Sequence, residues 1–216
     1  LHAWFNPYRA LAGDRFAPSA GHVRREHPDW TLKYGRDWWL NPGLPQVRQR
    51  VLDVILDVTR RYDVDGIHLD DYFYPYPVNG GDGKPVPFPD DDTYACYRNG
   101  GGALELTAWR RENVDQTVHA IYEGIKSVRR TVNFGIRPFG LWRPDFPPGT
   151  GGGLDPYEHM GADSRGWLQK GWVDYLVPQL YWTIDRPKLG FATYFEWWLG
   201  ENTLGRHIWP GMNTSK

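Results

Sequence analysis

The feature that most constrains the fold is a regular alternation of short apolar strands with amphipathic helices. In the first long helix, apolar residues recur at three- and four-residue spacing, and a proline suits its first turn. The expected strands cover 1–5, 65–70, 132–136, 175–181 and 207–209, and the expected helices cover 43–62, 104–130, 164–171 and 187–199. Such alternation predicts an α/β fold with a parallel sheet.

Two long irregular segments, at 72–102 and 138–153, each follow a predicted strand. Long loops after strands are typical of a (β/α)8 TIM barrel, whose active site lies at the carboxyl ends of the strands. A whole barrel needs eight strand–helix units and about 250 residues, so five strands in 216 residues predict an incomplete barrel. We therefore interpret residues 1–216 as a single partial domain. No glycine-rich phosphate motif follows a strand, which argues against a dinucleotide-binding fold.

Charge and composition exclude several classes of function. The net charge is −1, so no overall positive field favours nucleic acid. No apolar run approaches the ~20 residues of a membrane span, and a single cysteine, Cys96, excludes an internal disulfide framework. The sequence begins inside a predicted strand, without an initiator Met or a signal peptide, so we expect that the natural protein extends upstream.

Side-chain alternation along the strands predicts a polar rim. Along 66–70, His68 and Asp70 share one face, while Ile67 and Leu69 share the face toward the helices. The same parity turns further groups to the inner side of the sheet: His2, Trp4, Asn6, Gly135, Arg137, Phe139, Gln179 and Tyr181. Because charged groups are rarely buried without a partner or a purpose, Asp70 is the main catalytic candidate, and a structural ion pair with Arg137 is the alternative.

Aromatic residues form 16% of the chain, and many adjoin polar residues in apparent loops. Flat apolar faces beside hydrogen-bonding groups suit sugar rings, although the same residues also fill cores with their polar tips satisfied. The candidate stacking residues are Trp4, Tyr8, Tyr72, Tyr74, Trp142, Tyr181 and Trp182. Arg9, Arg137 and Arg143 are candidates for binding sugar carboxylates or for anchoring loops.

Six segments together resemble the glycosyl-hydrolase-like family 10 domain. They are LHAWFNPYRA, WWLNPGLPQVRQRVLDVILDVTRRYDVDGIHLDDYFYPYP, FPDDDTY, WRRENVD, FGIRPFGLWRP and GWVDYLVPQLYW. The resemblance covers nearly the whole chain and implies a TIM barrel present from about strand 3 to strand 7. It also implies cleavage of O-glycosidic bonds in bacterial envelope glycans, including peptidoglycan without stem peptides. An extracytoplasmic location follows from the same resemblance: periplasmic, cell-surface or secreted, with a possible lipid anchor upstream.

Glycoside cleavage uses two carboxyl groups. The 64–70 run is also similar to the strand that carries the nucleophilic Asp in α-amylase-type barrels, which supports Asp70 as nucleophile or oxocarbenium stabiliser. Asp71 is the nearest candidate for the general acid, and Asp155, Glu158, Asp185 or a group outside this chain are the others. Alternatively, the N-acetyl group of the substrate is the nucleophile and the Asp70–Asp71 pair assists it. His68, Asn6, Arg137, Gln179 and Tyr181 would orient the sugar.

Other readings have weaker support. The three aspartates at 90–92 carry carboxylates, which are the kind of ligand that calcium prefers. Their spacing matches no complete calcium-binding loop motif, however, and Asp is common in turns. A metal held by His68, Asp70 and Asp71 would indicate a deacetylase or phosphodiesterase, and only His2 is placed to complete it. We therefore predict neither metal nor cofactor. A carbohydrate-binding barrel without catalysis is the alternative from another functional class.

Overall fold

The computed structural model describes residues 1–14, 17–184 and 186–213. Its main element is a five-stranded sheet in the order β1 (His2–Phe5), β5 (Gly66–Leu69), β8 (Asn133–Ile136), β9 (Tyr175–Leu176) and β10 (His207–Ile208). All neighbouring strands in it are parallel. The predicted parallel α/β sheet is therefore confirmed. Within the described residues no ladder joins β1 to β10, so these strands form an open sheet rather than a closed barrel.

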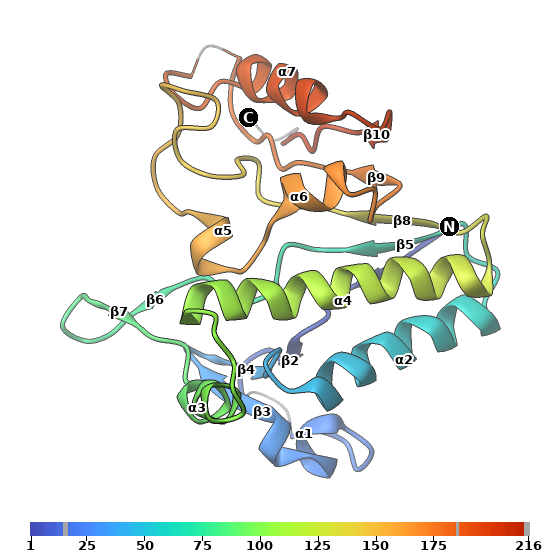
Figure 1. Ribbon diagram of the computed structural model, residues 1–216, viewed down its shortest axis with the longest axis vertical. Coiled ribbons are helices and arrows are strands. Elements are labelled where there is room, and N and C mark those ends of the chain that lie inside the picture. Colours follow the sequence, from blue (N-terminus) through green and yellow to red (C-terminus); the bar gives the residue numbers. More distant parts are fainter. Residues whose placement is uncertain (15–16, 185, 214–216) are drawn as a thin grey trace.

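Helices cover one face of this sheet (Figure 1). The two long helices α2 (Pro45–Arg61) and α4 (Leu106–Val128) pack on each other, and Figure 1 shows them side by side. Both helices bury an apolar stripe with helical spacing, which includes Val51 and Ile55 in α2 and Val118 and Ile121 in α4. The other helices are short: α1 (Val23–Glu26), the 3-10 helix at Pro28–Trp30, α3 (Asp91–Asn99), α5 (Pro156–His159), α6 (Ser164–Gln169) and α7 (Phe191–Glu201).

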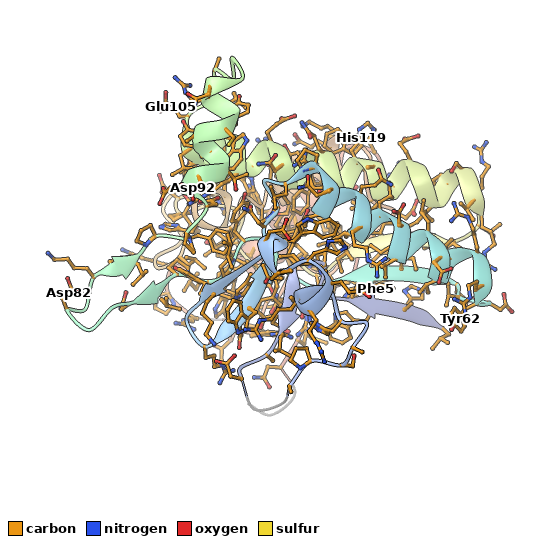
Figure 2. All side chains as sticks on the ribbon, turned by 90° about the horizontal axis from the view of Figure 1, so that it is seen from below. Phe5, Tyr62, Asp82, Asp92, Glu105 and His119 are labelled. Atoms are coloured by element: carbon orange, nitrogen blue, oxygen red, sulfur yellow. The ribbon has the colours of Figure 1, made fainter. Side chains whose placement is uncertain are left out.

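The long connections leave the sheet together at the carboxyl ends of the strands. Figure 1 shows the segments that follow β5 and β8 at the left, away from the N-terminus. They include the β6 (Val78–Asn79) and β7 (Pro85–Val86) hairpin, and Figure 2 shows its tip at Asp82 projecting from the body. The side chains on these connections therefore lie at one edge of the sheet, which is where the loop positions predict an active site.

Two sequence-based assignments differ from the structure. The strands β2 (Arg9–Leu11), β4 (Asp37–Leu40) and β3 (Thr31–Tyr34) form a separate antiparallel sheet in this order, in a part of the chain where the sequence pattern predicts no strand. The segment 72–102 is not wholly irregular, because it contains β6, β7 and α3. Helix α3 buries none of its residues, so it lacks the apolar stripe by which helices are recognised.

The fourth predicted strand is also shorter than expected. Regular pairing ends at Leu176, and beyond Pro178 the residue Gln179 forms isolated bridges to Phe139 and Gly211. Pro178 has no backbone N–H for the ladder, which explains the early end. No described helix is both long and apolar enough to cross a membrane.

Candidate active site

The site is built on the row of residues that follows β1, β5 and β8. Strand register pairs Phe5 with Leu69 and Leu69 with Ile136. The ladder continues for one more step, because Asp70 donates its N–H to Phe5 and Arg137 donates to Leu69. Asp70 and Arg137 are therefore neighbours at the carboxyl edge, with Asn6 beyond Asp70 on the other side. Ile67 and Leu69 are fully buried, as expected for the face opposite Asp70.

Asp70 is half-buried at this edge. Burial raises the pKa of its carboxyl group above the usual range, against the opposing effects of the Asp71 backbone N–H and of the positive charges of Arg137 and Arg9. A carboxyl group with a raised pKa retains its proton to higher pH than an exposed aspartate does. This is a property that a general acid requires.

Asp71 is buried, with 3% of its surface exposed. Its Oδ2 accepts hydrogen bonds from the Tyr76 hydroxyl and from Gln179 Nε2, the latter at 2.9 Å. Burial raises the pKa of Asp71, the Tyr76 hydrogen bond lowers it, and the negative charge of Asp70 raises it. Gln179 also donates to the Arg137 carbonyl at 3.3 Å, so it ties Asp71 to the end of β8.

Aromatic rings and cations surround the two carboxyl groups. The Arg137 guanidinium lies 5.6 Å from the Trp4 ring and 5.4 Å from the Tyr181 ring, and Arg9 lies 4.7 Å from the Tyr72 ring. Trp4 is 58% exposed and can therefore meet a ligand. These residues come from four separate segments of the sequence, which the parallel sheet and the small antiparallel sheet bring together.

Below the rim, the inner face of the sheet carries a hydrogen-bonded group of rings. The Tyr175 hydroxyl lies 2.9 Å from His2 Nδ1 and 3.0 Å from His68 Nδ1. Gly135 permits this arrangement, since a Cβ at that position would lie 2.1 Å from the Tyr175 ring. Trp4 contacts His68 edge to face with the ring centroids 5.5 Å apart. This group supports Trp4 from below.

The state of His68 leads to a testable pH effect. Burial, with smaller effects from His2 and Arg137, lowers the pKa of His68 to about 4. Between pH 6.5 and 4 the unfolded chain therefore binds more protons at this residue, so its contribution makes the protein less stable as the pH falls through that range. We expect His68→Gln to remove about 1 kcal/mol of this pH dependence, after allowance for the partial exposure of the ring.

The measurement is urea unfolding of both proteins at pH 4.5, 5.5 and 7. Asp70 and Asp71 act in the opposite direction, because their pKa values are raised in the folded state. The comparison therefore uses the difference between wild type and variant at each pH. A difference that does not change with pH would contradict a neutral, desolvated His68.

Several predicted site residues lie elsewhere. Tyr8 is fully buried with its hydroxyl 2.6 Å from Thr117 Oγ1, and Tyr74 is buried against the Phe88 ring, so both are core residues rather than stacking surfaces. Trp142 is buried and donates to Asp163 at 2.9 Å. Trp182 is half-buried and packs against Tyr194.

The alternative acids and cations are also accounted for. Asp155 and Glu158 both pair with Arg143 at 3.1 Å, so Arg143 anchors a loop. Asp185 lies outside the described residues. Asp90 is buried and paired with Arg110, and the structure describes no group of three or more His, Cys, Asp or Glu side chains arranged for a metal. Asn6 Oδ1 is buried and has no hydrogen-bond partner among the described residues.

Sequence reasoning overlooked two residues of this site, Tyr76 and Tyr175. Tyr175 has the same strand parity as Gln179 and Tyr181, so alternation alone could have identified it. Tyr76 lies on an irregular loop, where no periodicity predicts direction. Its contact with Asp71 depends on how that loop folds back over the edge of the sheet.

Comparisons with known proteins agree with this architecture. The chain is 40% identical over 208 residues to "Glycosyl hydrolase YngK" of Bacillus subtilis (strain 168), covering 93% of this chain and 39% of that protein. It is 32% identical over 211 residues to "Glycosyl hydrolase DigH" of Escherichia coli (strain K12), and this match covers 92% of this chain and 46% of that protein. The chain thus spans less than half the length of either relative.

Among solved structures, a Paenibacillus sp. cycloisomaltooligosaccharide glucanotransferase in complex with cycloisomaltoheptaose aligns with 98% of this chain and 26% of its own. The TM-score is 0.53 at 13% identity, which is a likeness of fold alone. The profile of the Glycosyl hydrolase-like 10 family matches residues 1–204. The chain therefore belongs to the Glycosyl hydrolase-like 10 family.

Proposed function

We propose that this chain carries the active site of a glycoside hydrolase that cleaves O-glycosidic bonds in a bacterial envelope glycan, with peptide-free peptidoglycan strands as substrate. Family membership supports the reaction class. Our proposal includes an extracytoplasmic location, and it treats the five-stranded sheet as strands 3 to 7 of a barrel. The observation that carries it is the Asp70–Asp71 pair at the carboxyl end of β5, flanked by Arg137, Trp4 and Gln179.

The hydrogen bonds of the two carboxyl groups support different roles for them. Tyr76 and Gln179 both donate to Asp71, an arrangement that suits an ionised carboxylate because a carboxylate only accepts. Burial raises the pKa of both carboxyl groups, but the hydrogen bonds from Tyr76 and Gln179 oppose this rise only for Asp71, since no described side chain donates a hydrogen bond to Asp70. A pair whose environments separate the two protonation states is the usual basis for assigning acid and base. Asp70 is then the proton donor, and Asp71 acts as an anion.

This assignment favours the substrate-assisted route. The acetamido oxygen of the sugar attacks the anomeric carbon, Asp71 orients and stabilises the acetamido N–H, and Asp70 protonates the leaving glycosidic oxygen. Water then opens the cyclic intermediate while Asp70 accepts its proton. The neighbouring polar residues Asn6, Arg137 and Gln179 at this edge carry no carboxyl group. A route that starts from the substrate's own N-acetyl group needs no further protein nucleophile.

Tyr76→Phe tests the state of Asp71. Removing the hydroxyl takes away a hydrogen bond that lowers the pKa of Asp71, so that pKa rises. Because Asp71 works as an anion, we expect the acid limb of the pH–rate profile to move upward by about 1 pH unit, with little change in the alkaline limb. Tyr72→Phe is the matched control, since Tyr72 is in the same loop and makes no hydrogen bond to Asp71. Movement of the alkaline limb instead would assign Asp71 as the general acid.

The direct test of the function is product release. Peptide-free peptidoglycan strands are incubated with the full-length protein, and soluble oligosaccharides are identified by mass spectrometry. We expect products with new reducing ends, absent from a sample of heat-denatured protein. Retained binding to the strands without any product would support the non-catalytic carbohydrate-binding alternative.

A further inference from the structure

Two arginines beside the carboxyl pair, Arg9 and Arg137, are half-buried. Arg137 is the neighbour of Asp70 on the adjacent strand, and its guanidinium lies near the Trp4 and Tyr181 rings. Arg9 approaches from the small antiparallel sheet and lies over the Tyr72 ring. Both charges act on Asp70. Both cations therefore lie near the reacting carboxyl group.

Neither guanidinium has an ion-pair or hydrogen-bond partner among the residues that the structure describes. Most other half-buried arginines do have one: Arg48, Arg110, Arg111, Arg129, Arg143, Arg165 and Arg206. Arg24 is the exception, and it packs over Trp38. A partly desolvated cation without a partner is unfavourable. At the reacting edge, two such cations indicate that the partner arrives with the ligand.

The stacking also limits what that partner can be. A guanidinium that lies over an aromatic ring keeps its N–H edge free, and this planar edge matches a carboxylate in bidentate geometry. A sugar hydroxyl is neutral and would leave the charge uncompensated. A carboxylate on the sugar satisfies both the charge and the geometry.

We propose that Arg137, assisted by Arg9, binds a carboxylate carried by the sugar, so that the site selects acidic glycan strands. This rests on the proposed function. On a peptidoglycan strand the group is the lactyl carboxylate, which is free only after the stem peptide has been removed, because the peptide is attached to it as an amide. Arg137 is then the residue that distinguishes a peptide-free strand from a strand that retains its peptides.

The experiment compares two forms of one substrate: peptide-free strands, and the same strands after their carboxyl groups are converted to methylamides. The full-length protein, Arg137→Gln and Arg143→Gln are assayed for product release on both, with circular dichroism as the check of folding. Arg143 is the matched control because it also lies over aromatic rings but is already paired with Asp155 and Glu158.

We expect wild type and Arg143→Gln to release products about 10- to 100-fold faster from the free strands, the range for a lost charge-assisted hydrogen bond. Arg137→Gln should reduce this ratio to within about threefold of unity, chiefly by losing activity on the free strands. Since Arg137 also affects Asp70, the ratio is the readout rather than either rate. Equal rates of wild type on both substrates, or an unchanged ratio in Arg137→Gln, would overturn the inference and leave the proposed function standing.

Binding of the same two substrates to Asp70→Asn separates the inference from the function. If wild type releases nothing from either substrate, the proposed hydrolase function fails and binding decides the inference. Tighter binding of the free strands, lost when Arg137→Gln is added, supports carboxylate recognition. Equal binding of both forms contradicts it.

Discussion

Replacing Asp70 with Asn is expected to slow glycan release by about a thousandfold, within the range for loss of a general acid. Asn has nearly the same shape as Asp, so the packing at the end of β5 should persist. What is lost is the proton that the carboxyl group retains, because burial raises its pKa. Product release is measured by mass spectrometry on peptide-free strands, and circular dichroism checks the fold.

A second substrate distinguishes between chemical roles for Asp70. In an N-acetylhexosaminide that carries a dinitrophenyl group, the dinitrophenolate leaves without being protonated. Asp70→Asn should therefore lower the hydrolysis of this substrate by only about tenfold. An equal loss on both substrates would assign Asp70 as the nucleophile instead. Asp63→Asn is the matched control, since Asp63 is fully exposed, and it should behave as wild type. Full activity of Asp70→Asn on the strands would remove Asp70 from the catalytic site.

The rim of the site could be predicted from the sequence because two regularities of a parallel sheet determine which residues lie there. Side chains alternate strictly along a strand, and a parallel ladder keeps neighbouring strands in register. Knowing that Ile67 faces the helices therefore places His68 and Asp70 on the other side. The same rule places Arg137 beside Asp70, and the register confirms it. For these residues, direction follows from the backbone alone.

The aromatic residues of the loops could not be sorted in this way. Tyr8 and Trp142 are both buried with their polar tips satisfied inside the protein, by Thr117 and Asp163. Tyr72 has a similar sequence context and lies beside the site. The difference is tertiary, because an amphipathic ring suits either a core or a sugar. The small antiparallel sheet was missed for a related reason, since its Trp and Leu residues lack a clear alternation.

Trp167→Ala is expected to lower the free energy of unfolding by about 3–5 kcal/mol, the usual range for removing a buried large aromatic. Trp167 is fully buried in α6, and its ring lies 5.0 Å from that of Phe73, two residues after Asp71. Its Nε1 donates to Asp115 Oδ1 at 2.6 Å. The variant therefore loses both the packing beneath the loop that follows Asp71 and the hydrogen bond to a half-buried carboxylate.

The hydrogen bond adds a pH dependence that a cavity alone would not produce. Burial raises the pKa of Asp115 to about 6, although the Trp167 hydrogen bond opposes the shift. Without that bond the pKa rises further, so ionisation near pH 7 costs the folded state more and the loss of stability is larger at pH 7.5 than at pH 5. Urea unfolding at both pH values measures this loss of stability. Trp167→Phe is a comparison that keeps most of the side-chain volume. Tyr62→Ala is a control at an exposed position and should change the stability by about 0.5 kcal/mol. The same loss for Trp167→Ala at both pH values would contradict the role of Asp115. Because Phe73 then loses its support, glycan release should fall even under conditions where the variant remains folded.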